Sequence, residues 1–143
     1  MLAELSRAVF LRDTASLSPR LAISRGWTVL RCEHPVLDVV VRYGTHALRL
    51  RFDCSGWDDM PPSIELLDEA GNHLPVVPPC SGVFNGSQHP TTGRPFVCMR
   101  GSREFHTHPS HLSEPWDDHR GKPGNDLLGL LDQLSRVWKR GVA

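Results

Sequence analysis

The segment WTVLRCEHPVLDVVVRYGTHALRLRFD, residues 27–53, decides the fold class of this chain. It contains three runs of apolar and β-branched residues, at 27–32, 36–42 and 47–53. Turn-forming steps separate the runs, at His34-Pro35 and at Tyr43-Gly44-Thr45. Because parallel strands need much longer connections than these, the segment predicts an antiparallel meander.

Alternation within the third run indicates which side of this sheet is buried. Leu48, Leu50 and Phe52 point to one face of a strand, while the charged residues between them point to the other. A fourth run, SIELL at 63–67, follows a turn-rich link that ends at Pro61-Pro62. We therefore expect a four-strand antiparallel meander with one apolar face.

Two amphipathic segments flank the meander. Residues 2–12 predict a short N-terminal helix, because Leu2, Leu5, Val9 and Phe10 recur at helical spacing. Residues from about 126 to 140 predict a C-terminal helix capped by Asn125 or Asp126. Its apolar stripe consists of Leu127, Leu130, Leu131, Leu134 and Val137–Trp138, and basic residues favour its C-terminal end at Arg136, Lys139 and Arg140.

The segment between the sheet and the last helix has a different character. Residues 75–95 hold five prolines and three glycines, which is typical of a Pro-rich crossover without regular structure. A hairpin is predicted next, with arms at 96–99 and 103–107, and residues 112–125 are again irregular. At 143 residues a second core would be hard to fit, so residues 1–143 are predicted to form one α+β domain.

The overall composition argues against several classes of protein. Sixteen basic residues balance sixteen acidic ones, so the chain lacks the basic excess typical of proteins that bind nucleic acid or anionic membranes. No apolar stretch approaches the roughly 20 residues that span a bilayer, and charges interrupt the first apolar run, unlike in a signal peptide. The cysteines include no CxxC pair, which favours reduced intracellular thiols, at Cys32, Cys54, Cys80 and Cys98. We therefore expect a cytoplasmic protein.

Metal-ligand residue types cluster in CMRGSREFHTHPSH, residues 98–111. In a hairpin that turns about Arg100-Gly101-Ser102, positions 98 and 104 lie opposite each other with Cβ atoms about 5 Å apart. Period-two alternation then places Glu104, His106 and His108 on the face that carries Cys98. One thiolate, one carboxylate and two imidazoles converge in this arrangement, so the segment is predicted to be a metal-binding hairpin.

Zinc is the expected ion, because this borderline-soft cation takes Cys, His and carboxylate ligands in tetrahedral geometry. His111, just past Pro109, can replace another histidine or lie beside the bound ion. The alternative for the same residues is a cluster of surface histidines beside a buried thiol. The predicted metal site consists of Cys98, Glu104, His106, His108 and His111, with the choice among the three histidines left open.

The order of features resembles the ubiquitin-conjugating fold, which is also called E2-like or RWD-like. The matching pieces are Pro78-Pro79, His89-Pro90-Thr91, Gly93, Cys98 and Pro115-Trp116. By this resemblance Cys98, nine residues after His89, is similar in position to the E2 nucleophile. Thr91 stands where the E2 pattern has asparagine, so the amide that would stabilise an oxyanion is missing at that position.

A narrower resemblance covers CMRGSREFHTHPSHLSEPW, residues 98–116, with Arg120 following. It is similar to the signature of small metal-binding proteins named for Cys, Glu, His and His (the CEHH type), which are encoded beside bacterial genes for ubiquitin-like conjugation. This resemblance implies a non-catalytic, zinc-binding accessory protein that binds an E1-like or E2-like component or the modifier. The genomic neighbourhood of the family implies a role in antiviral defence.

Two further functions stay open for the same residues. A thiolate held by zinc is not available for attack, so zinc ligation and nucleophilic catalysis compete for Cys98. If Cys98 is unligated, the E2 resemblance implies an active thioester carrier with His89 nearby. If a bound zinc keeps an open position and Glu104 is a base, the protein is a zinc-dependent hydrolase. The oligomeric state is also open, because the last helix can pack on its own sheet or on a neighbour.

Overall fold

The computed structural model of the chain describes residues 1–79 and 82–143, and Cys80 lies outside these residues. Four strands form an antiparallel sheet in the order β1-β2-β3-β4, and two short strands form a second sheet. The α+β class and the four-strand meander are therefore confirmed. The elements are α1 (Ala3–Thr14), α2 (Pro19–Arg25), β1 (Trp27–Glu33), β2 (Val36–Tyr43), β3 (His46–Asp53), β4 (Ser63–Leu67), β5 (Phe84–Asn85), β6 (Phe96–Val97), α3 (Arg103–Thr107), η1 (Pro109–His111), η2 (Trp116–Asp118) and α4 (Leu127–Val142).

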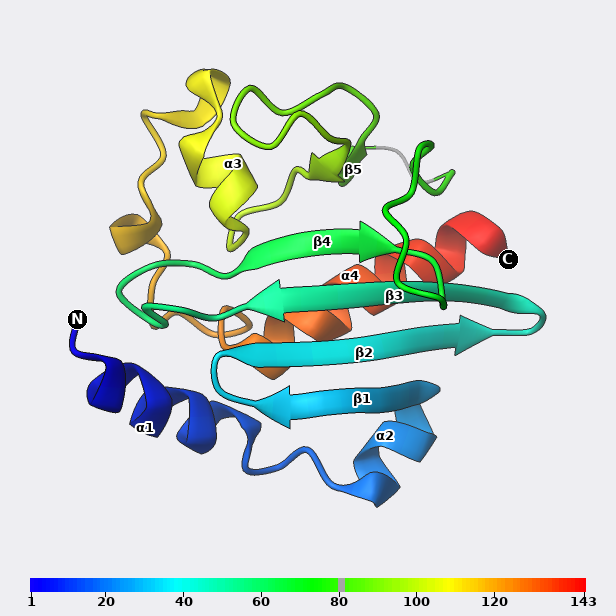
Figure 1. Cartoon of the computed structure of the whole chain (residues 1–143), viewed down its shortest axis with the longest axis horizontal. Coiled ribbons are helices and arrows are strands. Elements are labelled where there is room, and N and C mark those ends of the chain that lie inside the picture. Colours follow the sequence, from blue (N-terminus) through cyan, green and yellow to red (C-terminus); the bar gives the residue numbers. More distant parts are fainter. Residues whose placement is uncertain (80–81) are drawn as a thin grey trace.

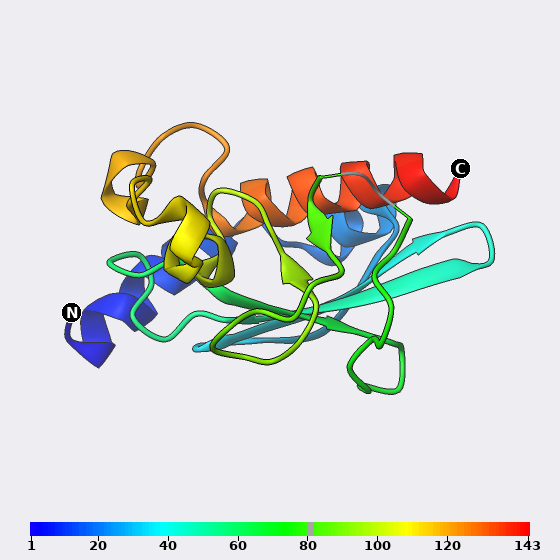
Figure 2. The same ribbon diagram turned by 90° about the horizontal axis from the view of Figure 1, so that it is seen from above.

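The core lies between one face of the large sheet and α4, which runs along that face (Figures 1 and 2). Asp126 begins the helix by accepting a hydrogen bond from the Gly129 N–H at 2.8 Å. Neither α4 nor any other helix in the described part of the chain is long and apolar enough to cross a membrane. The apolar faces predicted for β3 and α4 both lie in this core. It includes Leu48, Leu50 and Phe52 of β3 and Leu127, Leu130, Leu131 and Leu134 of α4.

Two helices lie beyond the β1 edge of the sheet (Figure 1). The predicted N-terminal helix is present as α1, but Leu2 and Leu5 are 67% and 55% exposed, so they are not part of its buried face. Phe10 is the large apolar side chain that α1 buries in the core. α2 was not predicted, although Ser18 caps it and Gly26, at φ +72°, ends it.

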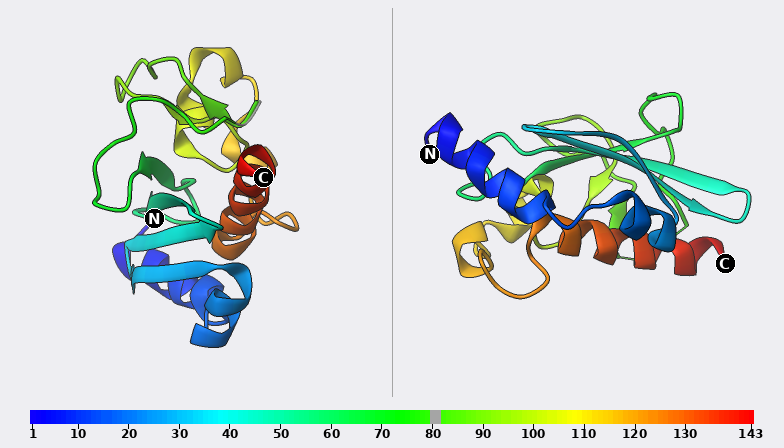
Figure 3. Two further views of the ribbon diagram at one scale, coloured as in Figure 1. Left: turned by 90° about the vertical axis from the view of Figure 1, so that its right-hand side faces the viewer. Right: turned by 90° about the horizontal axis from the view of Figure 1, so that it is seen from below.

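The segment from β5 to η1 lies beyond the opposite edge, next to β4 (Figures 1 and 3). Here the predicted hairpin is wrong in its second arm, because residues 103–107 form the helix α3. β6, which is part of the first arm, pairs with β5 instead. The Ser102 hydroxyl caps α3 by accepting from the Phe105 N–H at 3.1 Å, and it donates to the Val97 carbonyl at 2.7 Å. This cap favours a helical turn over a second strand.

Candidate active site

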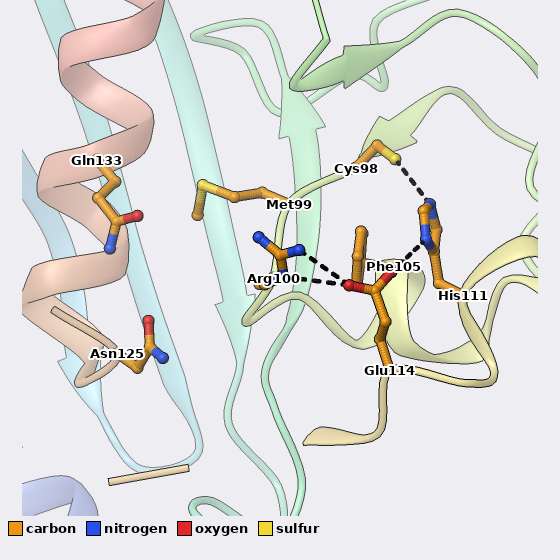
Figure 4. Close-up of a pocket in the computed structure, with 8 residues that line it drawn as sticks. All are labelled: Cys98, Met99, Arg100, Phe105, His111, Glu114, Asn125 and Gln133. Carbon is orange, nitrogen blue, oxygen red and sulfur yellow. Dashed lines mark hydrogen bonds and ion pairs between the residues drawn. The ribbon is translucent and has the colours of Figure 1, made fainter. Parts of the chain in front are cut away.

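Cys98 lies directly after β6, at the wall of an open pocket of about 380 Å³. Its N–H donates to the Val83 carbonyl at 2.6 Å, which continues the β5–β6 pairing by one residue. The pocket is within the size range of sites for small ligands. The residues that line it are Cys98, Met99, Arg100, Phe105, His111, Glu114, Asn125 and Gln133 (Figure 4).

A chain of three side chains leads away from the sulfur. The Cys98 Sγ lies 3.8 Å from the His111 Nε2, and the His111 Nδ1 lies 3.0 Å from a carboxylate oxygen of Glu114 (Figure 4). Since an ionised carboxylate only accepts hydrogen bonds, the proton of the uncharged imidazole belongs on Nδ1. The lone pair of Nε2 then faces the thiol, which is the arrangement of a nucleophile, a base and a group that orients the base.

Two neighbours hold the far end of this chain in place. The Arg100 guanidinium donates to the second carboxylate oxygen of Glu114 at 2.9 and 3.3 Å. Arg100, and after it His111, hold the pKa of Glu114 below its usual range, so this carboxylate is ionised at neutral pH. The ring of Phe105 stacks on His111 with the ring centroids 3.9 Å apart. Both ends of the imidazole are therefore engaged and its plane is supported.

The Cys98 thiol is protonated at rest. Partial burial raises its pKa above the ordinary value, while a hydrogen bond from the Asn85 side chain acts in the opposite direction. The pairing of β5 with β6 explains this contact, because Asn85 is opposite Phe96 and therefore diagonal to Cys98 on the same face. The Asn85 Oδ1 accepts from the Ser87 N–H at 2.8 Å, which orients its amide group. Such a thiol needs a base to become a nucleophile, and His111 is within reach.

The three acidic and histidine positions predicted on one strand face are separated by α3. Successive residues of a helix are rotated by about 100°, so Glu104 and His106 point in different directions. Glu104 points to β4, where its Oε1 accepts from the Ile64 N–H and from the Ser63 hydroxyl, each at 2.7 Å. Burial raises the pKa of Glu104, and the hydrogen bonds from Ser63 and Ile64 oppose that rise. Glu104 joins α3 to the sheet and does not contact the sulfur.

His106 is engaged on both ring nitrogens. Its Nε2 accepts from the Gly101 N–H at 3.0 Å, and its Nδ1 lies 2.7 Å from the carbonyl oxygen of Glu114. Burial lowers the pKa of His106, so its ring is uncharged at neutral pH. His106 therefore bridges two backbone segments rather than pointing into the pocket with Cys98.

The two remaining histidines of interest also lie apart from the sulfur. His108 hydrogen-bonds Ser110 in its own turn at 2.6 Å, and its ring stacks on Phe96. His89, the alternative catalytic residue, is 2% exposed, and its Nε2 donates to the Glu104 carbonyl at 2.9 Å. The imidazole next to Cys98 is that of His111.

The predicted metal ligands are thus brought together only in part. Cys98 and His111 meet, whereas Glu104, His106 and His108 are directed elsewhere. Across residues 1–79 and 82–143, no three His, Cys, Asp or Glu side chains gather in an arrangement that could hold a metal ion. Zinc binding by this segment stays a prediction.

Sequence reasoning missed Glu114, Arg100 and Asn85. The spacing of His111 and Glu114, three residues apart, is a signal for a carboxylate that meets an imidazole on one helical turn. Arg100 carried no signal, because its contact depends on how the loop after β6 lies against residue 114. Asn85 lay in a segment predicted to be irregular, so its pairing with β6 was not foreseen.

The C-terminal part of the chain, which carries this site, is similar to known proteins. A model of the Y4jH family, described as Y4jH-like, matches residues 85–143. The uncharacterized protein y4jH of Sinorhizobium fredii (strain NBRC 101917 / NGR234) is 44% identical over 41 residues, which are 29% of this chain and 20% of that protein. The chain thus matches about a fifth of the length of this relative. The region that resembles Y4jH-like proteins includes Cys98, His111 and Glu114.

Proposed function

We propose that the protein is a thiol-dependent acyl carrier of the E2-like type, in which Cys98 takes up the carboxyl terminus of a ubiquitin-like modifier as a thioester. The observation that carries this proposal is the series of contacts from Cys98 through His111 to Glu114. The Cys98 Sγ lies 3.8 Å from the His111 Nε2, and the His111 Nδ1 lies 3.0 Å from the Glu114 Oε2. A protonated thiol beside an oriented imidazole suits acyl transfer, because the base removes the thiol proton only as the sulfur attacks.

The proposed reaction balances without an oxidant or a reductant. His111 takes the Cys98 proton as the sulfur attacks the carbonyl carbon of a modifier thioester on an E1-like enzyme. The new carbon–sulfur bond forms at Cys98, the bond to the E1-like cysteine breaks, and the leaving thiolate takes the proton from His111. An amine of the target then attacks the carbonyl carbon of the Cys98 thioester, the carbon–sulfur bond breaks, and the proton that the amine loses passes through His111 to the Cys98 thiolate.

The order of elements in this chain supports the E2-like type, because it is similar to the order in the E2-like fold that the sequence resembles. An N-terminal helix, a four-strand meander, a cysteine beyond the last strand and a closing helix follow one another in both. Fold analogy alone does not define an activity, so the weight of the proposal lies on the contacts of Cys98.

The test combines the full chain with an E1-like enzyme, its ubiquitin-like modifier and ATP. We expect an adduct between the chain and the modifier that dithiothreitol cleaves, and that is lost in Cys98→Ala. The matched control is Cys32→Ala, which removes an exposed thiol on β1 and should leave the adduct unchanged. Absence of the adduct from the wild-type chain, while the E1-like enzyme is itself charged, would contradict the proposal.

A second candidate is a zinc-binding accessory protein of such a conjugation system. The observation that favours it is the 3.8 Å between the Cys98 Sγ and the His111 Nε2, which suits two ligands of one tetrahedral zinc ion. Metal content by mass spectrometry distinguishes the two candidates. About one zinc per tag-free chain, lost in Cys98→Ser, would favour the accessory protein, whereas zinc-free wild type would exclude it.

A further inference from the structure

His106 connects two loops that meet behind the candidate base. Its Nε2 accepts from the backbone N–H of Gly101, and its Nδ1 donates to the backbone carbonyl of Glu114. A backbone N–H can only donate and a carbonyl can only accept, so these two partners fix the proton of the uncharged ring on Nδ1. The ring also packs edge-on against Phe105 at 5.0 Å and lies 5.7 Å from Trp116.

The two backbone groups that His106 joins lie at or next to the residues that orient His111. Arg100 directly precedes Gly101, and Glu114 itself carries the second of these groups. With the two loops held together, the Arg100 guanidinium reaches one oxygen of Glu114 at 2.9 Å. The other oxygen of Glu114 then accepts from the His111 Nδ1 at 3.0 Å.

We propose that His106 is a positioning residue, whose bridge from Gly101 to Glu114 sets the carboxylate behind His111 and so directs the His111 lone pair at the Cys98 sulfur. The role of His106 in acyl transfer rests on the proposed function. The orientation of His111, in contrast, is a property of the protein in the absence of any acyl donor. A ligand role for His106 is incompatible with this bridge, because the Nε2 lone pair already accepts from Gly101.

The tautomers of the histidines test the bridge in the wild-type chain by nitrogen-15 NMR. Long-range proton–nitrogen correlations distinguish Nδ1–H from Nε2–H for each uncharged ring. Both His106 and His111 are expected as the Nδ1–H form, since the hydrogen bond that one nitrogen makes decides which of the two is protonated. A His106 ring protonated on Nε2 would overturn the proposal without any variant.

Two substitutions separate the bridge from the ring. His106→Phe keeps an aromatic ring but removes both hydrogen bonds, whereas His106→Gln keeps one donor and one acceptor. We expect His111 to change from the Nδ1–H to the Nε2–H form in His106→Phe and to stay Nδ1–H in His106→Gln. The control is His119→Ala, which removes a ring 5.7 Å from His106 and should leave His111 unchanged. Retention of the Nδ1–H form in folded His106→Phe, or its loss in His119→Ala, would overturn the proposal.

Acylation rates then test the link to chemistry. If His106 acts through Glu114, His106→Phe and Glu114→Gln slow the acylation of Cys98 by p-nitrophenyl acetate to a similar extent. The double variant is then no slower than the slower single variant, because both substitutions remove the same contact, that of the Glu114 carboxylate with the His111 Nδ1. Losses that multiply would mean that His106 acts by another route. A wild-type chain that fails to acylate at all would overturn the carrier, while the NMR result would still decide the bridge.

Discussion

Cys98 is the residue at which two opposing influences meet. Burial disfavours its thiolate, and the Asn85 side chain stabilises that thiolate by a hydrogen bond. Burial prevails, so the thiol stays protonated until a base acts on it. His111 provides that base at 3.8 Å, with its Nδ1 side held by Glu114. The reactivity of this residue therefore depends on its neighbours more than on its exposure.

Replacement of Asn85 by alanine tests the contribution of its amide. Without that hydrogen bond the pKa of Cys98 rises further, so alkylation by iodoacetamide near neutral pH should slow by roughly tenfold. The exposed thiol of Cys32 in the same sample is the internal reference, and its rate should not change. Equal alkylation of Cys98 in Asn85→Ala and in the wild type would show that the amide does not act on the sulfur.

At the scale of elements, the long patterns of β3 and α4 were predicted correctly, whereas the short α3 was not. β3 alternates over eight residues and α4 repeats its apolar stripe over 16, so both periods are unambiguous. α3 has five residues, too few to distinguish a period of two from one of 3.6. The Ser102 side chain caps α3, and this cap is the feature that favours a helix over a strand at these residues. The error moved Glu104 from the expected metal site to a contact with β4.

The contact between Glu104 and β4 predicts a pH-dependent effect of Glu104→Gln. The raised pKa of Glu104 means that the folded state holds its proton more tightly than the unfolded state does. Its stabilising contribution is therefore complete below the unfolded pKa, near 4.3, and is lost as the pH rises through the folded value. Glutamine keeps an acceptor oxygen but cannot ionise.

We expect the free energy of unfolding of Glu104→Gln, relative to wild type, to increase as the pH rises above about 4 and then to level off. Urea unfolding of both proteins over this pH range measures the difference. A constant difference at every pH would contradict a buried, ionisable Glu104.

At the scale of the whole molecule, the candidate site is assembled from segments that the sequence does not place near each other. β5 and β6 supply Asn85 and the position of Cys98, while η1 and the loop after it supply His111 and Glu114. These segments lie beyond β4 (Figure 1), and the turn at Gly101 lies against the Leu130 side chain of α4. The paths of such loops depend on backbone and side-chain contacts that no periodic pattern encodes, which is why the sheet was predicted and the Cys98–His111–Glu114 chain was not.

Substitution of Gly101 tests how the site is seated on α4. Gly101 has φ +102°, and a Cβ atom there would overlap the side chain of Leu130. Gly101→Ala should lower the free energy of unfolding by about 1 kcal/mol for the left-handed backbone and by a further 1–3 kcal/mol, roughly, for the overlap. Gly121→Ala is the matched control, because Gly121 has φ +75° and open space around it. Equal losses in the two variants would mean that Leu130 does not support the turn.

The rate at which p-nitrophenyl acetate acetylates Cys98, followed by mass spectrometry of the intact chain, tests the central claim most directly. Wild-type protein is expected to gain one acetyl group at Cys98, faster than at the exposed Cys32. His111→Gln should slow that step by about 100-fold or more at neutral pH, because the thiol loses its base. An unchanged rate in His111→Gln, or acetylation that prefers Cys32, would contradict a Cys98–His111–Glu114 active site.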